Sequence, residues 1–207
     1  MLFIAYACAA VVPPPARSAD PQGTDPTASA ARVGVSERRL NVRSGSRVLV
    51  TGAVRPGGVR VALQIRRRGR WLTLDRARAS SLGRYVLRAR LRRPMSAPVR
   101  VRVSGVASGG RALGRLNVYR YANASWYGPG FFGRRTGCGG RLGIGQLGVA
   151  HKTLPCGTRI TLRHGGHSVR VPVIDRGPYS GMREYDLTAA TARRLHFRGH
   201  GSILTTR

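Results

Sequence analysis

The residues best suited to chemistry in this chain are three acids in its last third. Positions 121–207 hold twelve Arg and one Lys, but the acids there are only Asp175, Glu184 and Asp186, which fall within twelve residues. Acids that served only solubility would be scattered through so basic a segment. Asp175 ends an apolar run beside a Gly-Pro turn, where a carboxyl group can be held in place. Two carboxyl groups at a set spacing are what cleavage of a glycosidic bond requires.

The elements around these acids are predicted to be short strands and one helix. Residues 159–164 and 168–174 alternate like strands on either side of a Gly-Gly turn. Residues 188–195 (T-A-A-T-A-R-R-L) predict a helix, with Thr188 as its N-cap and basic residues in its last turn. If Thr188 is the cap, Asp186 is free to face a cleft. The alternative is that Asp186 is itself the cap, or the partner of an arginine.

The cysteines indicate an oxidising compartment. If Cys8 leaves with a signal peptide, Cys138 and Cys156 remain as an even pair. A bridge between them would close a loop of about 19 residues and stabilise the fold by roughly 3 kcal/mol. The alternative is two buried free thiols. Neither C-x-x-C nor H-E-x-x-H spacing occurs, so the sequence predicts no metal site and no cofactor.

The N-terminus carries an apolar run of the length of a signal-peptide core. Residues 2–12 are apolar, are followed by three prolines, and are too few to span a bilayer as a helix. We expect residues 1–18 to be a signal peptide or an N-terminal anchor, and residues 19–32 a flexible linker. The protein is therefore expected to be secreted or in the cell envelope. It would touch a membrane only through this segment, if the segment stays uncleaved.

Positive charge is concentrated in the middle of the chain. The formal net charge is +30, and residues 33–120 hold 22 Arg against Glu37 and Asp75. Lys152 is the only lysine. Arginine favours planar, bidentate contacts with phosphate or carboxylate. A polyanionic partner is expected, and nucleic acid, an anionic membrane surface and an anionic wall polymer all fit. A codon-usage origin of the arginine excess is the alternative.

Residues 33–120 show the period-two alternation of half-buried antiparallel sheet. Apolar and polar residues alternate over 59–66, 85–91 and 99–103, and Gly-containing turns recur between such runs. Six or seven short strands in this length predict an immunoglobulin-like β-sandwich with an arginine-studded solvent face. We expect Trp71 to be a core residue. No catalytic constellation occurs in this unit.

Residues 121–207 carry three motifs. They read A-S-W-Y-G-P-G-F-F-G at 124–133, A-H-K-T-L-P-C-G-T at 150–158 and D-R-G-P-Y at 175–179, the last followed by Y-D-L-T-A-A-T-A-R-R-L at 185–195. In order and spacing the set resembles the rare lipoprotein A (RlpA) family, a double-psi β-barrel family related to expansins and barwin-like endoglucanases. The resemblance implies a closed six-stranded barrel with pseudo-twofold symmetry and one or two short helices. The whole chain is then expected to be all-β.

The resemblance also implies a function on the bacterial cell wall. Characterised members act on peptidoglycan glycan strands as lytic transglycosylases, whereas expansin relatives bind and loosen wall polysaccharide without hydrolysing it. The family's aspartate and histidine correspond to Asp175 and His151, and the aspartate important in expansins to Asp186. Gly140 stands where the family usually has a glutamate. Two hypotheses follow: a lytic transglycosylase with Asp175 as acid and base, and an expansin-like binding module without turnover. A bridge between Cys138 and Cys156 in the loop that lacks the glutamate would make the domain more similar to the expansins.

Transglycosylation needs one carboxyl group, which protonates the leaving oxygen and then activates the sugar's own 6-hydroxyl. Asp175 is the candidate, with Asp186 as its neighbouring carboxylate. His151 is predicted to bond a carboxylate or a sugar hydroxyl, with a core histidine as the alternative. Further candidates for substrate binding are Trp126, Tyr127, Lys152 and Tyr179. A core position is the alternative for Trp126 and Tyr127, and an exposed position without contact is the alternative for Lys152.

The expected partner is peptidoglycan or another anionic wall polysaccharide, bound by a monomer. No nucleic-acid motif occurs, and aromatic residues are not interleaved with the arginine runs, so a specific nucleic-acid partner is not expected. The arginine-rich unit is most simply a tether to anionic wall polymer. Such a tether would raise the local concentration of the barrel at its substrate.

Overall fold

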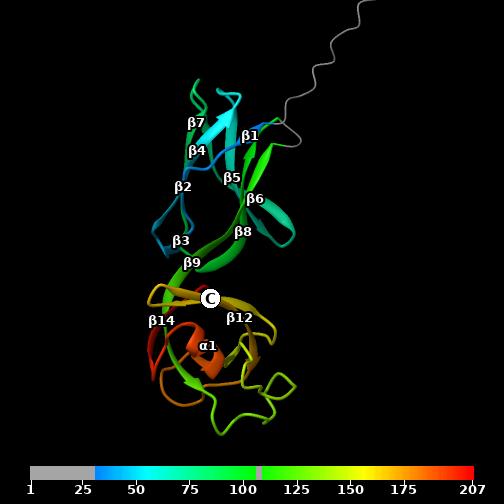
Figure 1. Ribbon diagram of the computed structural model, residues 1–207, viewed down its shortest axis with the longest axis vertical. Coiled ribbons are helices and arrows are strands. Elements are labelled where there is room, and N and C mark those ends of the chain that lie inside the picture. Colours follow the sequence, from blue (N-terminus) through cyan, green and yellow to red (C-terminus); the bar gives the residue numbers. More distant parts are fainter. Residues whose placement is uncertain (1–30, 106–108) are drawn as a thin grey trace, which may run out of the picture.

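The structure, a computed structural model, describes residues 31–105 and 109–207. The expected signal peptide and nearly all of the expected linker lie outside the described residues. Almost every element is a strand, and the one helix among the described residues is α1 (Ala189–Arg194) (Figure 1). The prediction of an all-β chain is confirmed. No helix within the described ranges is long and apolar enough to cross a membrane.

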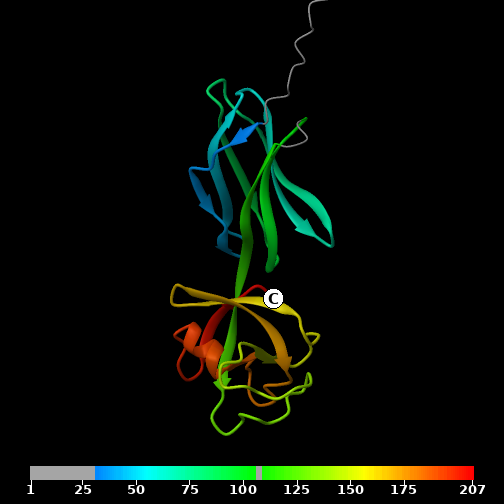
Figure 2. The same ribbon diagram turned by 45° about the vertical axis from the view of Figure 1, so that its right-hand side comes forward.

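The first unit consists of two sheets around one apolar core. One sheet contains β1 (Arg32–Val33), β2 (Glu37–Arg39), β4 (Arg47–Arg55) and β7 (Arg84–Arg90). The other contains β3 (Asn41–Arg43), β5 (Arg60–Arg67), β6 (Arg70–Arg78), β8 (Met95–Val103) and the first part of β9 (Gly110–Tyr127). Alternate residues face inward, so that Val50 of one sheet and Leu63 of the other are fully buried. The two layers are visible in Figure 2; the immunoglobulin-like topology stays a prediction.

Trp71 is not in this core, and the expectation that it would be is wrong. Trp71 pairs with Arg66, an outward-facing position of β5, so the register places the indole on the outer face of the sheet. There the guanidinium carbon of Arg100 lies 3.9 Å from the centroid of the ring. An aromatic residue at a strand end indicates burial only where its cross-strand partner faces the core.

Strand β9 belongs to both units. Its 18 residues pair with β8 and β3 in the first unit and with β14 and β13 in the second. The predicted boundary at residue 120 therefore lies inside one continuous strand, which Figure 2 shows running from one unit into the other. Residues 116–127 contain no Gly or Pro that would interrupt the strand.

The second unit is a closed barrel of six strands. They are β9, β10 (Val149–His151), β11 (Arg159–His164), β12 (His167–Asp175), β13 (Tyr185–Thr188) and β14 (Gly201–Thr205). Their order is β13–β10–β12–β11–β14–β9, and β9 pairs again with β13. The β9–β13 and β10–β12 pairs are parallel and the other four antiparallel. Exchanging β9–β10–β11 with β12–β13–β14 reproduces this pattern, which confirms the predicted pseudo-twofold double-psi barrel.

Helix α1 begins where the sequence predicts. The Thr188 side-chain oxygen accepts a hydrogen bond from the Thr191 N–H at 3.2 Å, which makes Thr188 the N-cap. The Thr188 hydroxyl also donates to the Gln146 carbonyl at 2.7 Å and ties the helix start to the loop that precedes β10. The cap is thus supplied by Thr188, and Asp186 is free of that role.

Candidate functional site

Asp175 and Asp186 lie in one row across the outer face of the barrel. Ala150 of β10 pairs with Asp175 on one side and with Asp186 on the other. Laterally paired residues project from the same face, and two strand spacings separate the two Cα atoms by about 10 Å. Ala150, a small residue, stands between the two aspartates in this row. The structure therefore brings together the two aspartates that the sequence singled out.

A bulge in β12 turns Asp175 onto this face. Val173 points into the barrel core and is buried, so strict alternation would send Asp175 inward as well. Val173 pairs with Val149. The next residue of β10, Ala150, pairs with Asp175, so that Ile174 has no partner. The extra residue reverses the alternation, as bulges beside functional sites do.

Backbone donors hold the Asp175 carboxylate. Its Oδ1 accepts hydrogen bonds from the N–H groups of Gly137 at 2.6 Å and Arg176 at 2.8 Å. A side chain at position 137 would place its Cβ 2.7 Å from the Cγ of Arg176, so this approach of the loop requires glycine. Gly140, where the family has a glutamate, lies in the same loop and is exposed with φ +78°.

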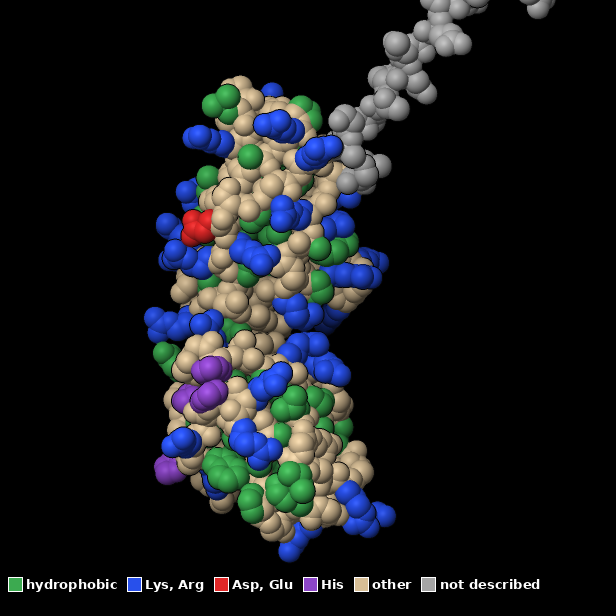
Figure 3. Space-filling model, in the orientation of Figure 1, with side chains coloured by type: hydrophobic (Ala, Val, Ile, Leu, Met, Phe, Trp, Pro, Cys, Tyr) green, Lys and Arg blue, Asp and Glu red, His purple; other side chains and the backbone are tan. Residues whose placement is uncertain are grey.

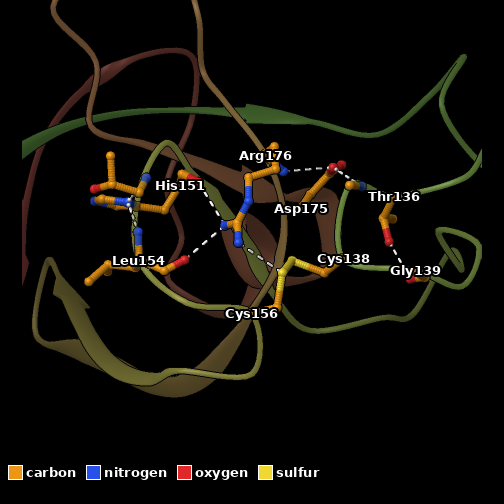
Figure 4. The surroundings of a disulfide bond; sticks show 10 residues. Thr136, Cys138, Gly139, His151, Leu154, Cys156, Asp175 and Arg176 are labelled. Atoms are coloured by element: carbon orange, nitrogen blue, oxygen red, sulfur yellow. Dashed lines mark hydrogen bonds between the residues drawn. A yellow bond between two sulfur atoms is a disulfide. The ribbon is translucent and has the colours of Figure 1, made fainter.

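The Arg176 guanidinium points away from Asp175. Its Nη1 donates to the carbonyl groups of His151 at 3.2 Å and Leu154 at 2.8 Å, and its Nη2 donates to Cys156 Sγ at 3.0 Å. Figure 4 shows this side chain between His151 and the disulfide. Arg176 therefore braces the loop after β10. Within the described residues neither Asp175 nor Asp186 forms an ion pair.

The predicted disulfide between Cys138 and Cys156 is present, with 5.6 Å between the Cα atoms. Cys138 directly follows Gly137, whose N–H donates to Asp175. The bridge therefore ties the loop that reaches Asp175 to the loop that Arg176 braces (Figure 4).

Asp186 has the more unusual environment of the two aspartates. Burial raises its pKa and the neighbouring Asp175 carboxylate adds to the rise, against a hydrogen bond from Ser125 Oγ and the charge of Arg183. The Ser125 hydroxyl donates to Asp186 Oδ1 at 2.7 Å and accepts from Arg183 Nη1 at 3.0 Å. A carboxyl group with a raised pKa keeps its proton to higher pH, which is the property of a general acid.

The Tyr127 hydroxyl is buried close to the Asp175 carboxylate, within reach of a hydrogen bond to it, although it forms no bond of standard geometry among the described residues. Burial raises the pKa of this phenol, and the charges of Asp175 and Asp186 raise it further. The ring packs edge-on against Phe131, with 5.8 Å between centroids. The hydroxyl therefore belongs to the surroundings of the Asp175 carboxylate.

His151 lies on the other face of β10. Alternation turns it away from the Ala150 face, and its ring packs on Tyr185 with 5.0 Å between centroids. Its Nδ1 accepts from the N–H groups of Thr153 at 3.1 Å and Leu154 at 3.0 Å, so the proton of the neutral ring is on Nε2. Burial lowers the His151 pKa and favours that neutral form. The structure does not bring His151 to the aspartates.

A cavity of about 370 Å³ lies on the His151 side and is also lined by Lys152, Met182 and Glu184. Glu184, the third clustered acid, binds Arg120 through two hydrogen bonds of 2.8 and 2.6 Å. That contact holds the Glu184 pKa below its ordinary value. Glu184 therefore clamps the loop before β13 to β9. No three His, Cys, Asp or Glu side chains of the described chain could hold a metal ion together.

The aromatic candidates are dispersed. Trp126, 39% exposed, lines a separate apolar cavity of about 360 Å³ with Phe132 and Phe197. Figure 3 shows hydrophobic side chains gathered on this part of the barrel. Tyr179 is 80% exposed in the loop after Asp175. Neither ring stands in the row of the two aspartates.

Sequence reasoning missed Ser125, Gly137 and Arg183. Ser125 lies within the first motif, but its contact with Asp186 crosses a parallel strand pair and 61 positions of sequence. Gly137 lies in the same loop as Gly140, which stands where the family usually has a glutamate. That departure from the family pattern was the sequence signal that could have drawn attention to this loop.

The second unit is similar to known proteins. Residues 120–205 match the family model described as lytic transglycolase. The probable endolytic peptidoglycan transglycosylase RlpA of Synechocystis sp. is 49% identical over 84 residues, which cover 39% of this chain and 26% of that protein. Its counterpart from Neisseria meningitidis serogroup A is 45% identical over 82 residues, 39% of this chain and 34% of that protein. The probable counterpart from Aquifex aeolicus is 35% identical over 108 residues, 51% and 48% of the two chains.

The second unit is therefore an RlpA-like double-psi β-barrel domain, as predicted. The matched segments span from about a quarter to about a half of the length of these relatives.

Proposed function

We propose that the barrel cleaves peptidoglycan glycan strands by lytic transglycosylation, in the cell envelope or outside the cell and as a monomer. The observation that carries the proposal is Asp186, a carboxyl group with a raised pKa in one row with Asp175. The names of the relatives supply the substrate, and the row of small and acidic side chains supplies the chemistry.

In the proposed reaction, Asp186 gives its proton to the glycosidic oxygen, and the bond from that oxygen to C1 breaks. The Asp175 carboxylate, oriented by two backbone N–H groups, stabilises the positive charge that develops on the sugar ring. The Asp186 carboxylate then takes the proton of the sugar's own 6-hydroxyl, whose oxygen bonds to C1. The proton returns to its starting point, no water is consumed, and the product is an anhydro sugar.

This scheme changes one assignment made from sequence. The sequence favoured Asp175 as acid and base, whereas the burial of Asp186 supports giving it the proton and leaving Asp175 as the stabilising carboxylate. The scheme uses Asp175 and Asp186 alone and does not require a carboxyl group at position 140.

The test is digestion of purified peptidoglycan by the full chain, with mass spectrometry of the released fragments. Wild type is expected to release anhydro-sugar ends, and Asp175→Asn to release at least 100-fold less, because charge stabilisation of this kind contributes about 10²–10³-fold. Glu184→Gln is the matched control, since it removes a carboxylate from the same cluster but outside the row, and it should retain release while folded.

The second candidate function is expansin-like binding without turnover. The observation that favours it is Gly140, an exposed glycine where the family has a carboxylate. It predicts co-sedimentation with insoluble peptidoglycan and no anhydro-sugar fragments even after long incubation. That outcome would contradict the enzyme proposal.

A further inference from the structure

Five arginines lie in three adjacent rows on the outer face of the larger sheet in the first unit. Lateral pairing places the outward positions in three adjacent rows, namely Arg76–Ala62–Arg102, Thr73–Gln64–Arg100, and the pairs Trp71–Arg66 and Pro98–Arg115. No outward position in these rows is acidic. Asp75, the acid within these strands, bonds instead to the N–H of Arg88 on β7 at 2.7 Å. Within the described ranges, these rows therefore hold guanidinium groups and no carboxylate.

Arg100 is held in place at the centre of these rows. Its Nε donates to Gln64 Oε1 at 2.9 Å, and its guanidinium carbon lies 3.9 Å from the centroid of the Trp71 ring. Gln64 is positioned in turn, because its Nε2 donates to Thr73 Oγ1 at 3.2 Å. A guanidinium that is already ordered loses less entropy when it binds an anion.

The guanidinium groups are close enough to repel one another. Burial lowers the Arg100 pKa, and the charges of Arg102 and Arg66 lower it further. Like charges gathered in this way destabilise the compact state. A bound anion would remove that cost.

The basic face continues onto the barrel. Arg115 Nε donates to Ser96 Oγ at 3.0 Å, and the Thr161 hydroxyl of β11 donates to the same oxygen at 3.4 Å. Thr161 pairs with Arg170, whose pKa is lowered by burial and then by the charges of Arg115 and Arg159. Figure 3 shows Lys and Arg side chains along both units and where they meet.

We propose that this face binds a linear polyanion lengthwise, and that the polyanion is a phosphodiester-linked wall polymer. The track consists of Arg66, Arg100, Arg102, Arg115, Arg159 and Arg170. Nucleic acid has the same linkage, but it is bound through stacked aromatic rings as well. Trp71 is the one aromatic ring in these rows, and Arg100 covers it. The choice of a wall polymer rests on the proposed function of the barrel, whose substrate is in the wall.

The test measures binding of the full chain to synthetic poly(glycerol phosphate) at several salt concentrations. The track variant carries Arg66→Gln, Arg100→Gln and Arg170→Gln together. The control carries Arg47→Gln, Arg84→Gln and Arg90→Gln on the opposite sheet and has the same net charge. Each arginine beside an anionic surface contributes about five-fold to affinity, so the track variant should bind about 100-fold more weakly and the control less than about five-fold. The slope of log affinity against log salt should fall by about 2 in the track variant.

Equal losses in the two triple variants would show that net charge alone attracts the polymer, and would overturn the track. Tighter binding of single-stranded DNA than of poly(glycerol phosphate) with the same number of phosphates would overturn the wall assignment. Both triple variants should melt no lower than wild type, because like-charge repulsion is relieved. Release of anhydro sugars from soluble glycan strands that lack the polymer should be unchanged in the track variant. If the arginine track fails this test, the proposed function of the barrel is unaffected. If the barrel shows no turnover, binding of the polymer by the track can still be measured.

Discussion

The two units of this chain use the same structural element with opposite treatment of charge. In the first unit, residues 33–120 contain 22 Arg and only two acids, Glu37 and Asp75. Most of these arginines occupy outward positions of the strands. In the barrel, two carboxyl groups stand in one row around a single small residue, Ala150. The first arrangement provides an extended charged surface, and the second provides a localised site. Register shifts occur in both units, at Leu63/Gln64 and Val99/Arg100 in the first and at Val149/Ala150 in the barrel.

Two features build the barrel row. The bulge at Ile174 rotates Asp175 outward, and the parallel pairing of β9 with β13 brings Ser125 to Asp186. Strand β9 runs from the first unit into the second without a break. One sheet can therefore supply both a charged face and a site, and what distinguishes the site is that the bulge at Ile174 brings two carboxyl groups into one row.

The largest effect is expected for Asp186→Asn. Loss of a general acid costs about 10²–10⁴-fold in rate, so anhydro-sugar release should fall by about 10³-fold. Wild-type activity should decline as rising pH removes the Asp186 proton. Product release quantified by mass spectrometry across pH checks both statements. Wild-type release by an Asp186→Asn variant would contradict the assignment of Asp186 as the general acid, and the barrel row would then be no more a catalytic site than the arginine face is.

The next effect concerns the disulfide. Replacing Cys138 and Cys156 with Ser should lower the free energy of unfolding by about 3 kcal/mol, because the bridge closes a loop in the unfolded chain. Thermal unfolding by circular dichroism measures the loss. Anhydro-sugar release at a temperature where the variant is still folded should also fall, since the Gly137 N–H would be less firmly held on Asp175. Unchanged release in the folded variant would show that the loop keeps its place without the bridge.

Tyr127→Phe should separate chemistry from stability. The hydroxyl lies at the Asp175 carboxylate but forms no bond of standard geometry among the described residues. Its removal should therefore change the unfolding free energy little, while the rate falls by about 10-fold or more. The matched control is Tyr185→Phe. The Tyr185 hydroxyl shares a 3.2 Å hydrogen bond with Thr205, and its loss should cost about 1 kcal/mol of stability with little change in the rate of the folded protein.

The smallest effects are two opposite dependences of stability on pH. The Glu184 pKa is lowered mainly by its hydrogen bonds to Arg120, so this contact stabilises the fold above the unfolded pKa of about 4.3 and is lost as pH falls through the folded pKa. Glu184→Gln should cost about 1 kcal/mol at neutral pH, a modest value because the pair is partly exposed. The cost should vanish in acid.

Asp186 should show the opposite sign. Its raised pKa means that ionisation destabilises the fold, and stability is lost as pH rises from the unfolded pKa of about 3.9 through the folded one. Asp186→Asn should therefore melt higher than wild type at neutral pH and equally at pH 3. Melting temperatures of both variants at the two pH values test the pair. The same sign for both would contradict the assigned environments.

Much of the fold could be predicted because its signals are local. Alternation of apolar and polar residues predicted the strands at 159–164 and 168–174, and Thr188 predicted the helix start because its side chain is suited to an N-cap. The bulge at Ile174 could not be read in this way, since an unpaired residue is defined by the neighbouring strand. The position of Trp71 was missed for the same reason, because its cross-strand partner, and not its own sequence neighbours, decides which face it occupies.

The candidate site was predictable in composition and less so in arrangement. The clustering of Asp175 and Asp186 in a basic segment was visible in the sequence, and the structure places both in one row. The displacement of His151 to the opposite face of β10 was not visible, because a three-residue strand gives too little alternation to assign its faces. Ser125 and Gly137 reach the aspartates from distant segments, and only the closed barrel makes them neighbours.

The most direct measurement is a titration of Asp186 by carboxyl carbon NMR in the full chain, with the resonance assigned from the Asp186→Asn spectrum. We expect Asp186 to titrate above the ordinary aspartate value of about 3.9 and to move back toward it in Asp175→Asn, because the Asp175 charge contributes to the rise. Titration at or below the ordinary value, unaffected by Asp175→Asn, would contradict the account.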